Sequence, residues 1–212
     1  MREALKKRVL IVYYSFTQQT RILVRQFCRG LEGEGVEVAF ERIKPLNPYE
    51  FPFKTDLRLV NVMIRTFFRG RKEVEPVSDR CFEAWDYIVL AGPTWSYHPS
   101  GPMLDFLDRY GASVLRGQKV IPFISCRSYW RLHHLSLRRV FKKLGAEPQA
   151  PIIFMHPTKE PYRFIGLLLK LRGKMIRRNW FRKHYEMYGH SKEQAMQAFD
   201  YGVKLGKSML DS

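Results

Sequence analysis

The stretch from residue 9 to residue 20 constrains the fold of this chain more than any other part of the sequence. It reads VLIVYYSFTQQT, so an apolar, β-rich run ends abruptly in three hydroxyl-bearing residues, Ser15, Thr17 and Thr20. An amphipathic helical pattern begins directly after them. The backbone N–H groups and the dipole at a helix N-terminus favour an anion, and the hydroxyls add further donors. The segment therefore predicts a strand–loop–helix unit with a site for a phosphate group.

A simpler interpretation of the same loop is that Ser15 or Thr17 only caps the helix. Three hydroxyls exceed what one cap needs. The loop also lacks the Gly-x-Gly-x-x-Gly pattern of dinucleotide-binding folds and the Gly-Lys-Ser/Thr pattern of P-loops. The hydroxyl-rich form therefore favours a different kind of phosphate loop.

Strand and helix patterns alternate along the rest of the chain. Strands are expected at residues 8–14, 36–43, 87–91, 119–125 and 151–155, and helices at 18–32, 54–69, 101–110, 130–144 and 191–210. This order favours the α/β class, with a three-layer, doubly wound, five-stranded parallel sheet. At 212 residues we expect one domain over 1–212. In such sheets ligands bind beyond the carboxyl ends of the strands at the topological switch point, which brings the loops 15–20 and 92–97 together.

These two loops resemble those of the flavodoxin-like superfamily. Tyr14 followed by Ser15-Phe16-Thr17-Gln18-Gln19-Thr20 is similar to its FMN phosphate loop, an aromatic residue before Ser-x-Thr-x-x-Thr. Residues 91–108, AGPTWSYHPSGPMLDFLD, resemble the second flavin loop and following helix of flavodoxins and NAD(P)H:quinone reductases. The alternative for this segment is a proline-rich turn with buried aromatic residues. The resemblance covers 8–155 and resumes at 191–210, and it implies a flavodoxin-like fold with FMN as the cofactor.

The resemblance implies that three loops bind FMN. Their candidate residues are Ser15, Phe16, Thr17, Gln18, Gln19, Thr20, Pro93, Thr94, Trp95, Ser96, Tyr97, Ser125, Cys126, Arg127 and Tyr129. Trp95 and Tyr97 would form the walls of a flat slot, and Tyr129 or Trp130 would cover the second face of the ring. The chain departs from the family at Arg127, because flavodoxins usually carry acids and glycines there.

A cation at Arg127 would stabilise the negative charge of a reduced flavin, which favours hydride chemistry over one-electron shuttling. The alternative is that Arg127 points to solvent. His98 is a second weak candidate, either as a proton donor to a bound quinone or as a packing residue beside Pro99. We expect His133 and His134 on the surface of a basic helix. No catalytic residue is certain, and no metal site is expected.

The positive charge of the chain, +17 overall, is concentrated in two segments. Residues 53–72 carry a net +5 and residues 159–183 a net +8. The second segment lies in residues 156–190, which the resemblance does not cover and which form a predicted basic insertion before the last helix. On one helix, five basic residues of the insertion would share a side, namely Arg163, Lys170, Lys174, Arg177 and Arg178. Such a helix suits an anionic membrane surface, or it buries its apolar side on the protein body or in a homodimer.

The leading hypothesis is an FMN-binding oxidoreductase that passes electrons from NAD(P)H or a protein donor to a quinone-like or other hydrophobic acceptor. The alternatives are a flavodoxin-type electron carrier and a flavin-free binding protein that acts through its basic surface. An acidic protein is a further expected partner, and nucleic acid is disfavoured because no recognised nucleic-acid motif is present. Cys28, Cys81 and Cys126 have no metal-ligand spacing and favour a reducing compartment. With no apolar leader at the N-terminus, we expect a cytoplasmic protein, with a peripheral position at the inner membrane face as an extension.

Overall fold

A parallel sheet forms the centre of the structure, a computed structural model that describes residues 6–174, 179–185 and 188–211. The strands are β1 (Arg8–Tyr13), β2 (Glu37–Arg42), β3 (Tyr87–Trp95), β4 (His98–Pro99), β5 (Lys119–Cys126), β6 (Glu147–Pro148) and β7 (Ile152–Met155). Their order is β2-β1-β3-β5-β6, and β7 also pairs with β5. All pairs along this path are parallel, as is the β5–β7 pair, and only β4 runs antiparallel to its neighbour β3. The predicted α/β class and doubly wound order are confirmed.

The predicted strand at 151–155 corresponds to β7, and a short strand, β6, that was not predicted precedes it. β6 pairs with the beginning of β5, where Lys119 lies beside Glu147, and β7 pairs with its end, where Phe123 lies beside Ile152. The predicted third strand is too short, because β3 continues beyond residue 91 to Trp95 and then turns back into β4.

The helices follow the predicted order with some additions. They are α1 (Gln19–Gly33), α2 (Asp56–Phe67), α3 (Gly101–Arg109), α4 (Gly111–Leu115), α5 (Trp130–Leu144), α6 (Tyr162–Leu171), α7 (Asn179–His184) and α8 (Lys192–Leu210), with a 3₁₀ helix at Asp79–Phe82. A capping box between Ser191 and Gln194 stabilises the start of α8. None of the described helices combines the length and hydropathy needed to cross a bilayer.

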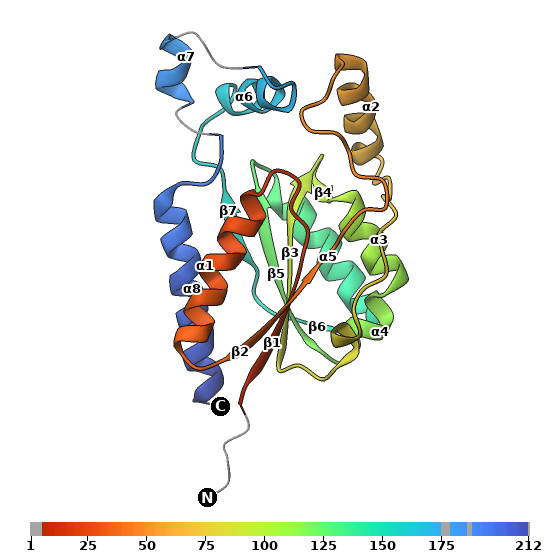
Figure 1. Cartoon of the computed structure of the whole chain (residues 1–212), viewed down its shortest axis with the longest axis vertical. Helices are drawn as coiled ribbons and strands as arrows, with labels where there is room; N and C mark the ends of the chain where they lie inside the picture. Colours follow the sequence, from red (N-terminus) through yellow and green to blue (C-terminus); the bar gives the residue numbers. More distant parts are fainter. Residues whose placement is uncertain (1–5, 175–178, 186–187, 212) are drawn as a thin grey trace, which may run out of the picture.

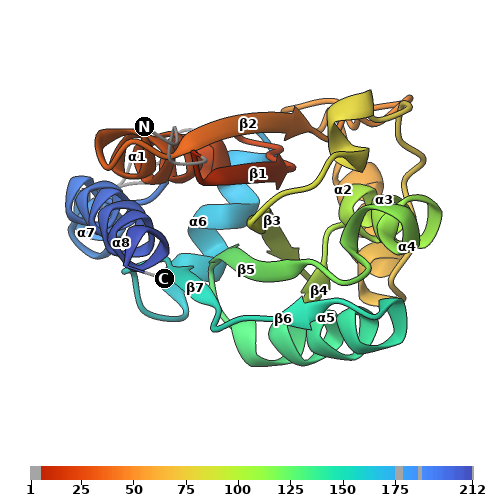
Figure 2. The ribbon, with the colours of Figure 1, turned by 90° about the horizontal axis from the view of Figure 1, so that it is seen from below.

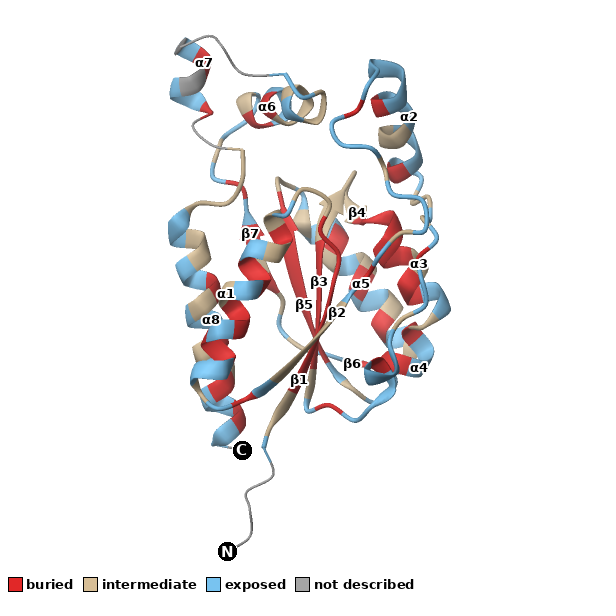
Figure 3. Cartoon of the chain, in the orientation of Figure 1, coloured by how far each residue is buried: buried red, intermediate tan, exposed pale blue. Residues whose placement is uncertain are grey.

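The helices cover both faces of the sheet, which gives three layers (Figures 1 and 2). One face packs on α1 and α8 through alternate strand residues such as Val9 and Ile11. The other face packs on α3, α4 and α5 through Leu10 and Val12. The two-residue alternation of β1 therefore feeds two cores, as expected of a strand that is buried on both sides. Figure 3 shows this buried centre in red between the exposed outer sides of the helices.

Two glycines let α1 and α8 approach closely. A Cβ at Gly202 would lie 2.1 Å from the backbone oxygen of Phe27, and a Cβ at Gly30 would lie 2.2 Å from that of Phe199. No side chain fits at either position without separating the helices. These contacts hold the end of the chain against the first helix, so α8 supports the helix that begins at the candidate phosphate loop.

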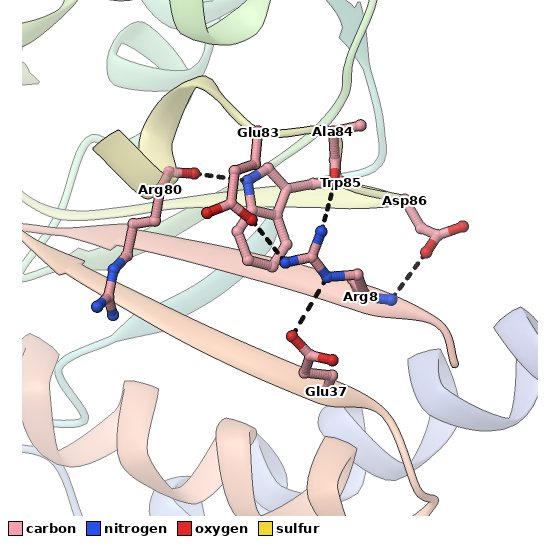
Figure 4. Close-up of polar contacts among 7 residues, drawn as sticks. All are labelled: Arg8, Glu37, Arg80, Glu83, Ala84, Trp85 and Asp86. Atoms are coloured by element: carbon pink, nitrogen blue, oxygen red, sulfur yellow. Dashed lines mark hydrogen bonds and ion pairs between the residues drawn. The ribbon is translucent and has the colours of Figure 1, made fainter. Parts of the chain in front are cut away.

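The amino end of β1 is fastened by Arg8 (Figure 4). Its guanidinium donates to Glu37 at 3.2 Å and to Glu83 at 2.7 Å, and lies 4.3 Å from the ring centroid of Trp85. The contacts join the starts of β1 and β2 to the segment that precedes β3. This end of the sheet is therefore closed by structural contacts, which leaves the carboxyl ends of the strands for a ligand.

The carboxyl ends of the strands lie below α2, α6 and α7, which gather at one end of the molecule (Figure 1). The predicted insertion is thus not a single long helix, because α6 ends at Leu171 and Gly173 follows with φ of +66°. Arg177 and Arg178 of the predicted basic side lie outside the described residues. The prediction that Arg163 lies on the basic side of an exposed helix is wrong. Arg163 is buried, and its Nε lies 2.9 Å from a carboxylate oxygen of Glu160.

Candidate functional site

A cavity of about 760 Å³ lies beyond the carboxyl ends of β1, β3 and β5, at the switch point where β1 and β3 are neighbours. Its floor and walls are the three predicted loops, and its far side is formed by α2 and α6. All predicted cofactor-binding residues except Gln18 line this cavity. The volume lies in the upper part of the range of small-molecule sites, about 300–1,000 Å³.

The first loop presents hydroxyl groups at the start of α1. The N-cap residue is Gln18, which has a left-handed backbone with φ of +65° and makes no side-chain cap hydrogen bond. Ser15 supplies one bond to the helix start, because its Oγ accepts from the backbone N–H of Arg21 at 3.3 Å. Within the described part of the chain, no hydrogen bond occupies the side-chain hydroxyls of Thr17 and Thr20, and both residues line the cavity. The simple capping role therefore accounts for Ser15 but not for the two threonines.

Gln18 is exposed and does not line the cavity. Its Oε1 accepts from the guanidinium of Arg21 at 3.1 Å. The next residue, Gln19, lines the cavity and accepts from the backbone N–H of His190 at 3.0 Å. The two neighbouring glutamines thus have different surroundings, which the sequence pattern did not separate.

The second loop is a β-hairpin, in which Trp95 pairs with His98 and Thr94 with Pro99. Its two turn residues, Ser96 and Tyr97, have φ values of +43° and +74°. These left-handed conformations are uncommon for residues with a Cβ and concentrate at functional sites. A hydrogen bond of 2.8 Å between the hydroxyls of Ser96 and Thr66 ties the turn to α2. The hairpin therefore fixes where Tyr97 stands at the edge of the cavity.

The aromatic residues of the site form two groups. Trp95 makes edge contacts with Tyr14 and Phe16, at 5.7 and 5.8 Å between ring centroids. Tyr97 instead contacts Tyr129 of the third loop, at 4.6 Å between centroids and an interplanar angle of 61°. Trp130, the alternative cover of the ring, packs against the core below and does not line the cavity. The pair that can flank a flat ligand is therefore Tyr97 and Tyr129.

Arg127 lines the cavity and is held by the end of the insertion. One guanidinium nitrogen donates to the hydroxyl of Tyr185 and another to the carbonyl of Tyr188, both at 3.0 Å. The guanidinium also lies 4.7 Å from the ring centroid of Tyr188. The alternative that Arg127 points to solvent is therefore wrong, because its guanidinium is held by these contacts. A fixed positive charge stands at this wall of the cavity.

The three histidines singled out in the sequence have different surroundings in the structure. The prediction that His133 lies on the surface is wrong, because it is only 2% exposed and its Nδ1 lies 2.7 Å from the Thr94 hydroxyl. Burial lowers the pKa of His133 to about 3, so the ring is neutral at pH 7. His98 does not line the cavity, its Nδ1 is buried without a partner, and burial lowers its pKa. His134 is half-buried, and burial lowers its pKa as well.

The third loop also contributes Cys126, which lines the cavity but is itself buried. Burial raises the pKa of its thiol to about 12, so the thiolate is scarce at neutral pH. Cys28, Cys81 and Cys126 are all free cysteines. In the part of the chain that the structure describes, no group of three His, Cys, Asp or Glu residues could hold a metal ion.

Sequence reasoning missed the residues that come to the cavity from distant segments. His156 follows β7, and its Nε2 lies 3.1 Å from the carbonyl of Tyr188. His190 lies 2.8 Å from Ser125. The residues missed from other segments are Tyr49, Phe53, the apolar side of α2, and Phe164, Leu167, Leu168 and Leu171 of α6. The only sequence signal for them was the helical spacing of apolar residues in 54–69 and 162–171, which does not say what those sides face.

Comparison with known proteins gives the fold alone. No protein-family model matches the chain, and no curated protein sequence matches it. Similar solved structures include a flavoprotein in complex with FMN from Lactobacillus acidophilus, which is 16% identical with a TM-score of 0.53 and covers 69% of this chain and 93% of its own. A flavodoxin from the domain Archaea is 13% identical with a TM-score of 0.54, covering 95% and 97% of the two chains. A further similar structure, from Bacteroides eggerthii, is 15% identical with a TM-score of 0.55 and covers 80% of this chain and 100% of its own.

Proposed function

We propose that this chain, which has the flavodoxin-like fold, is a flavoprotein that binds FMN in the cavity at the switch point. The observation that carries the proposal is the cradle at the start of α1, where Thr17 and Thr20 line the cavity and their hydroxyls have no hydrogen-bond partner in the described chain. A helix N-terminus with such donors suits a phosphate group. The FMN complex of the similar Lactobacillus protein supports the choice of cofactor.

The donor set of the site fits FMN. Thr17, Thr20 and the backbone N–H groups of the first turn of α1 would hold the phosphate. Tyr97 and Tyr129 would flank the ring system. A ring inserted between two others needs about 7 Å between the outer ring planes, because stacked carbon atoms lie about 3.5 Å apart. The 4.6 Å between the two tyrosine centroids means that these side chains must separate when FMN enters.

The proposed activity is that of an oxidoreductase that passes electrons from NAD(P)H or a protein donor to a quinone-like or other hydrophobic acceptor. FMN, when bound, supplies the redox chemistry, and the protein supplies placement and electrostatics. The held guanidinium of Arg127 would favour the reduced, negatively charged cofactor. The cavity also extends past the cradle to apolar side chains of α2 and α6, such as Met63, Phe67 and Leu168. This part of the cavity supports an acceptor that is itself apolar.

The second candidate is a flavin-free binding protein with the same fold, and the direct contact between Tyr97 and Tyr129 favours it. A flavodoxin-type electron carrier is a third form of the proposal, and its partner would be acidic because the chain carries +17.

One experiment separates these functions. The purified chain is examined for flavin absorbance, titrated with FMN, and then mixed with NADH or NADPH and a soluble quinone. Bound FMN with quinone-dependent oxidation of NAD(P)H supports the oxidoreductase. Bound FMN without this turnover supports the carrier. A colourless protein that does not bind added FMN would overturn the flavoprotein proposal and support the flavin-free alternative.

A further inference from the structure

The end of the molecule that carries α2 and α6 exposes an unusual set of large apolar side chains. We define the cap surface as the exposed apolar residues of these two helices and the residue after α2, namely Leu57, Val60, Ile64, Phe67, Phe68, Phe164 and Ile165. Leu57 is 79% exposed and Phe68 is 75% exposed, the two highest values among the large apolar residues described as exposed. Exposed apolar groups that gather in one place mark an interaction site.

The exposed apolar residues of α2 lie on a different side of the helix from its buried residues. α2 already has a core side, because Leu59 and Thr66 are buried. Residues 57, 60, 64, 67 and 68 fall on another side at helical spacing, and Arg58 and Arg65 border it. The helix is therefore apolar on a side that it does not need for its own packing. Helices that lie in a membrane interface have this pattern, an apolar side bordered by basic residues.

The charges around the cap surface have one sign. The acidic side chains of segments 50–72 and 156–174 are all paired, Glu50 with Lys54 and Arg58, Asp56 with Arg172, and Glu160 with Arg163. Arg65, Lys170 and Lys174 are exposed and have no carboxylate partner among the described residues. In the described part of the chain, these two segments therefore offer unpaired cations but no unpaired carboxylates. An anionic headgroup layer complements this charge.

The cap surface also leads into the cavity. The ring of Phe68 contacts Phe67 at 5.3 Å, Phe67 contacts Tyr97 at 6.4 Å, and Tyr97 contacts Tyr129. Val60, Ile64, Phe67, Phe68 and Phe164 belong both to the cap surface and to the cavity lining. An apolar route thus runs from the outside of α2 to the place where the ring of FMN is proposed to lie.

We propose that the cap surface docks on an anionic lipid bilayer, with Leu57 and Phe68 inserted among the lipids and Arg65 and Lys174 at the headgroups. In this position the apolar route opens toward the bilayer, so a lipid-soluble molecule enters the cavity without crossing water. The docking itself rests on the surface residues and is independent of the proposed redox function, whereas the entry of an electron acceptor rests on that function.

The test is flotation of the full chain with vesicles. One set consists of phosphatidylcholine alone, and the other also contains phosphatidylserine. We expect binding to the anionic vesicles only, with weaker binding as salt is raised, because salt screens the surface potential. Phe68→Ser and Leu57→Ser should each lower partitioning about tenfold, since each removes a large apolar group from the bilayer. The matched control is Leu210→Ser, at an exposed residue at the C-terminal end of α8, remote from the cap surface (Figure 1).

A second pair of variants tests the charge. Lys174→Glu should lower binding to anionic vesicles about tenfold, because each basic residue near the surface contributes substantially to attraction. Lys207→Glu makes the same change at an exposed site on α8 and should leave binding unchanged. Absorbance of added FMN and thermal melting are recorded for every variant, so loss of docking is distinguished from loss of the cofactor site or of the fold.

Three results would overturn the proposal. The first is no binding to either vesicle type, and the second is equal binding to both. The third is a loss in the two control variants as large as in the cap-surface variants. Self-association of the chain that Phe68→Ser abolishes, with no vesicle binding, would assign the cap surface to a second copy of the chain instead.

Discussion

The Nε2 atom of His190 lies 2.8 Å from the Oγ of Ser125, although the two residues are 65 positions apart. The other ring nitrogen lies 3.0 Å from Gln194 of α8, and the backbone N–H of His190 donates to Gln19 of α1. His190 therefore joins the end of the insertion to the third loop and to the start of the first helix. His190 also lines the cavity.

The first prediction concerns this junction. Ser125→Ala should lower the free energy of unfolding by about 1–2 kcal/mol, because it leaves a half-buried ring nitrogen of His190 without its partner. Urea denaturation of the apoprotein measures the change. The matched control is Ser208→Ala, where the hydroxyl is exposed and donates only to the Leu205 carbonyl of its own helix. A loss at Ser208 as large as at Ser125 would contradict the structural role of the junction.

The second prediction concerns the phosphate cradle. Thr20→Val keeps the shape of a buried residue and removes only its hydroxyl. We expect the dissociation constant for FMN to rise about tenfold or more, because a hydrogen bond to a charged group is lost. Quenching of FMN fluorescence measures it. Thr158→Val, outside the cavity lining, should leave FMN affinity unchanged; unaltered affinity in Thr20→Val would place the phosphate elsewhere.

The third prediction is a pH dependence from His133. Its pKa is lowered to about 3 in the folded chain by burial, whereas an unfolded histidine titrates near 6.5. The unfolded state therefore binds more protons between these values, and this contribution to stability is complete above pH 6.5 and is lost as pH falls below it. The slope approaches about 1.4 kcal/mol per pH unit. His133→Asn keeps a polar atom near Thr94 and should flatten stability between pH 6.5 and 5; parallel profiles for both proteins would refute this assignment.

The fourth prediction concerns the approach of α1 and α8. Gly202→Ala should lower stability by about 3 kcal/mol, because the new methyl group would meet the backbone oxygen of Phe27. Gly33→Ala makes the same change within α1, where a Cβ meets nothing within 4 Å. That variant should be neutral or stabilised by up to about 1 kcal/mol, since alanine is the better helix former. Thermal melting compares the pair, and equal effects would show that the helix contact is not close.

Sequence patterns were sufficient for the layers of the fold. The continuous apolar run before Ser15 is typical of a strand buried on both faces, and the amphipathic segments after the strands have the period of a helix, so both signals are local. The end of β3 was not predicted correctly. The strand continues to Trp95 because the chain turns back at Ser96 and Tyr97, which both have positive φ. Neither residue is a glycine or asparagine, the usual sequence signals for such a turn.

The amino-acid sequence by itself determined the α/β alternation and the two loops at the switch point, because each follows from short-range spacing and from the handedness of parallel connections. Only the tertiary structure decided that His133 is buried behind Thr94, that Arg127 is held by Tyr185, and that α2 and α6 form the far side of the cavity. These relationships join segments 39 to more than 100 residues apart. They depend on which sides of separate elements meet when the chain packs, and no local period carries that information.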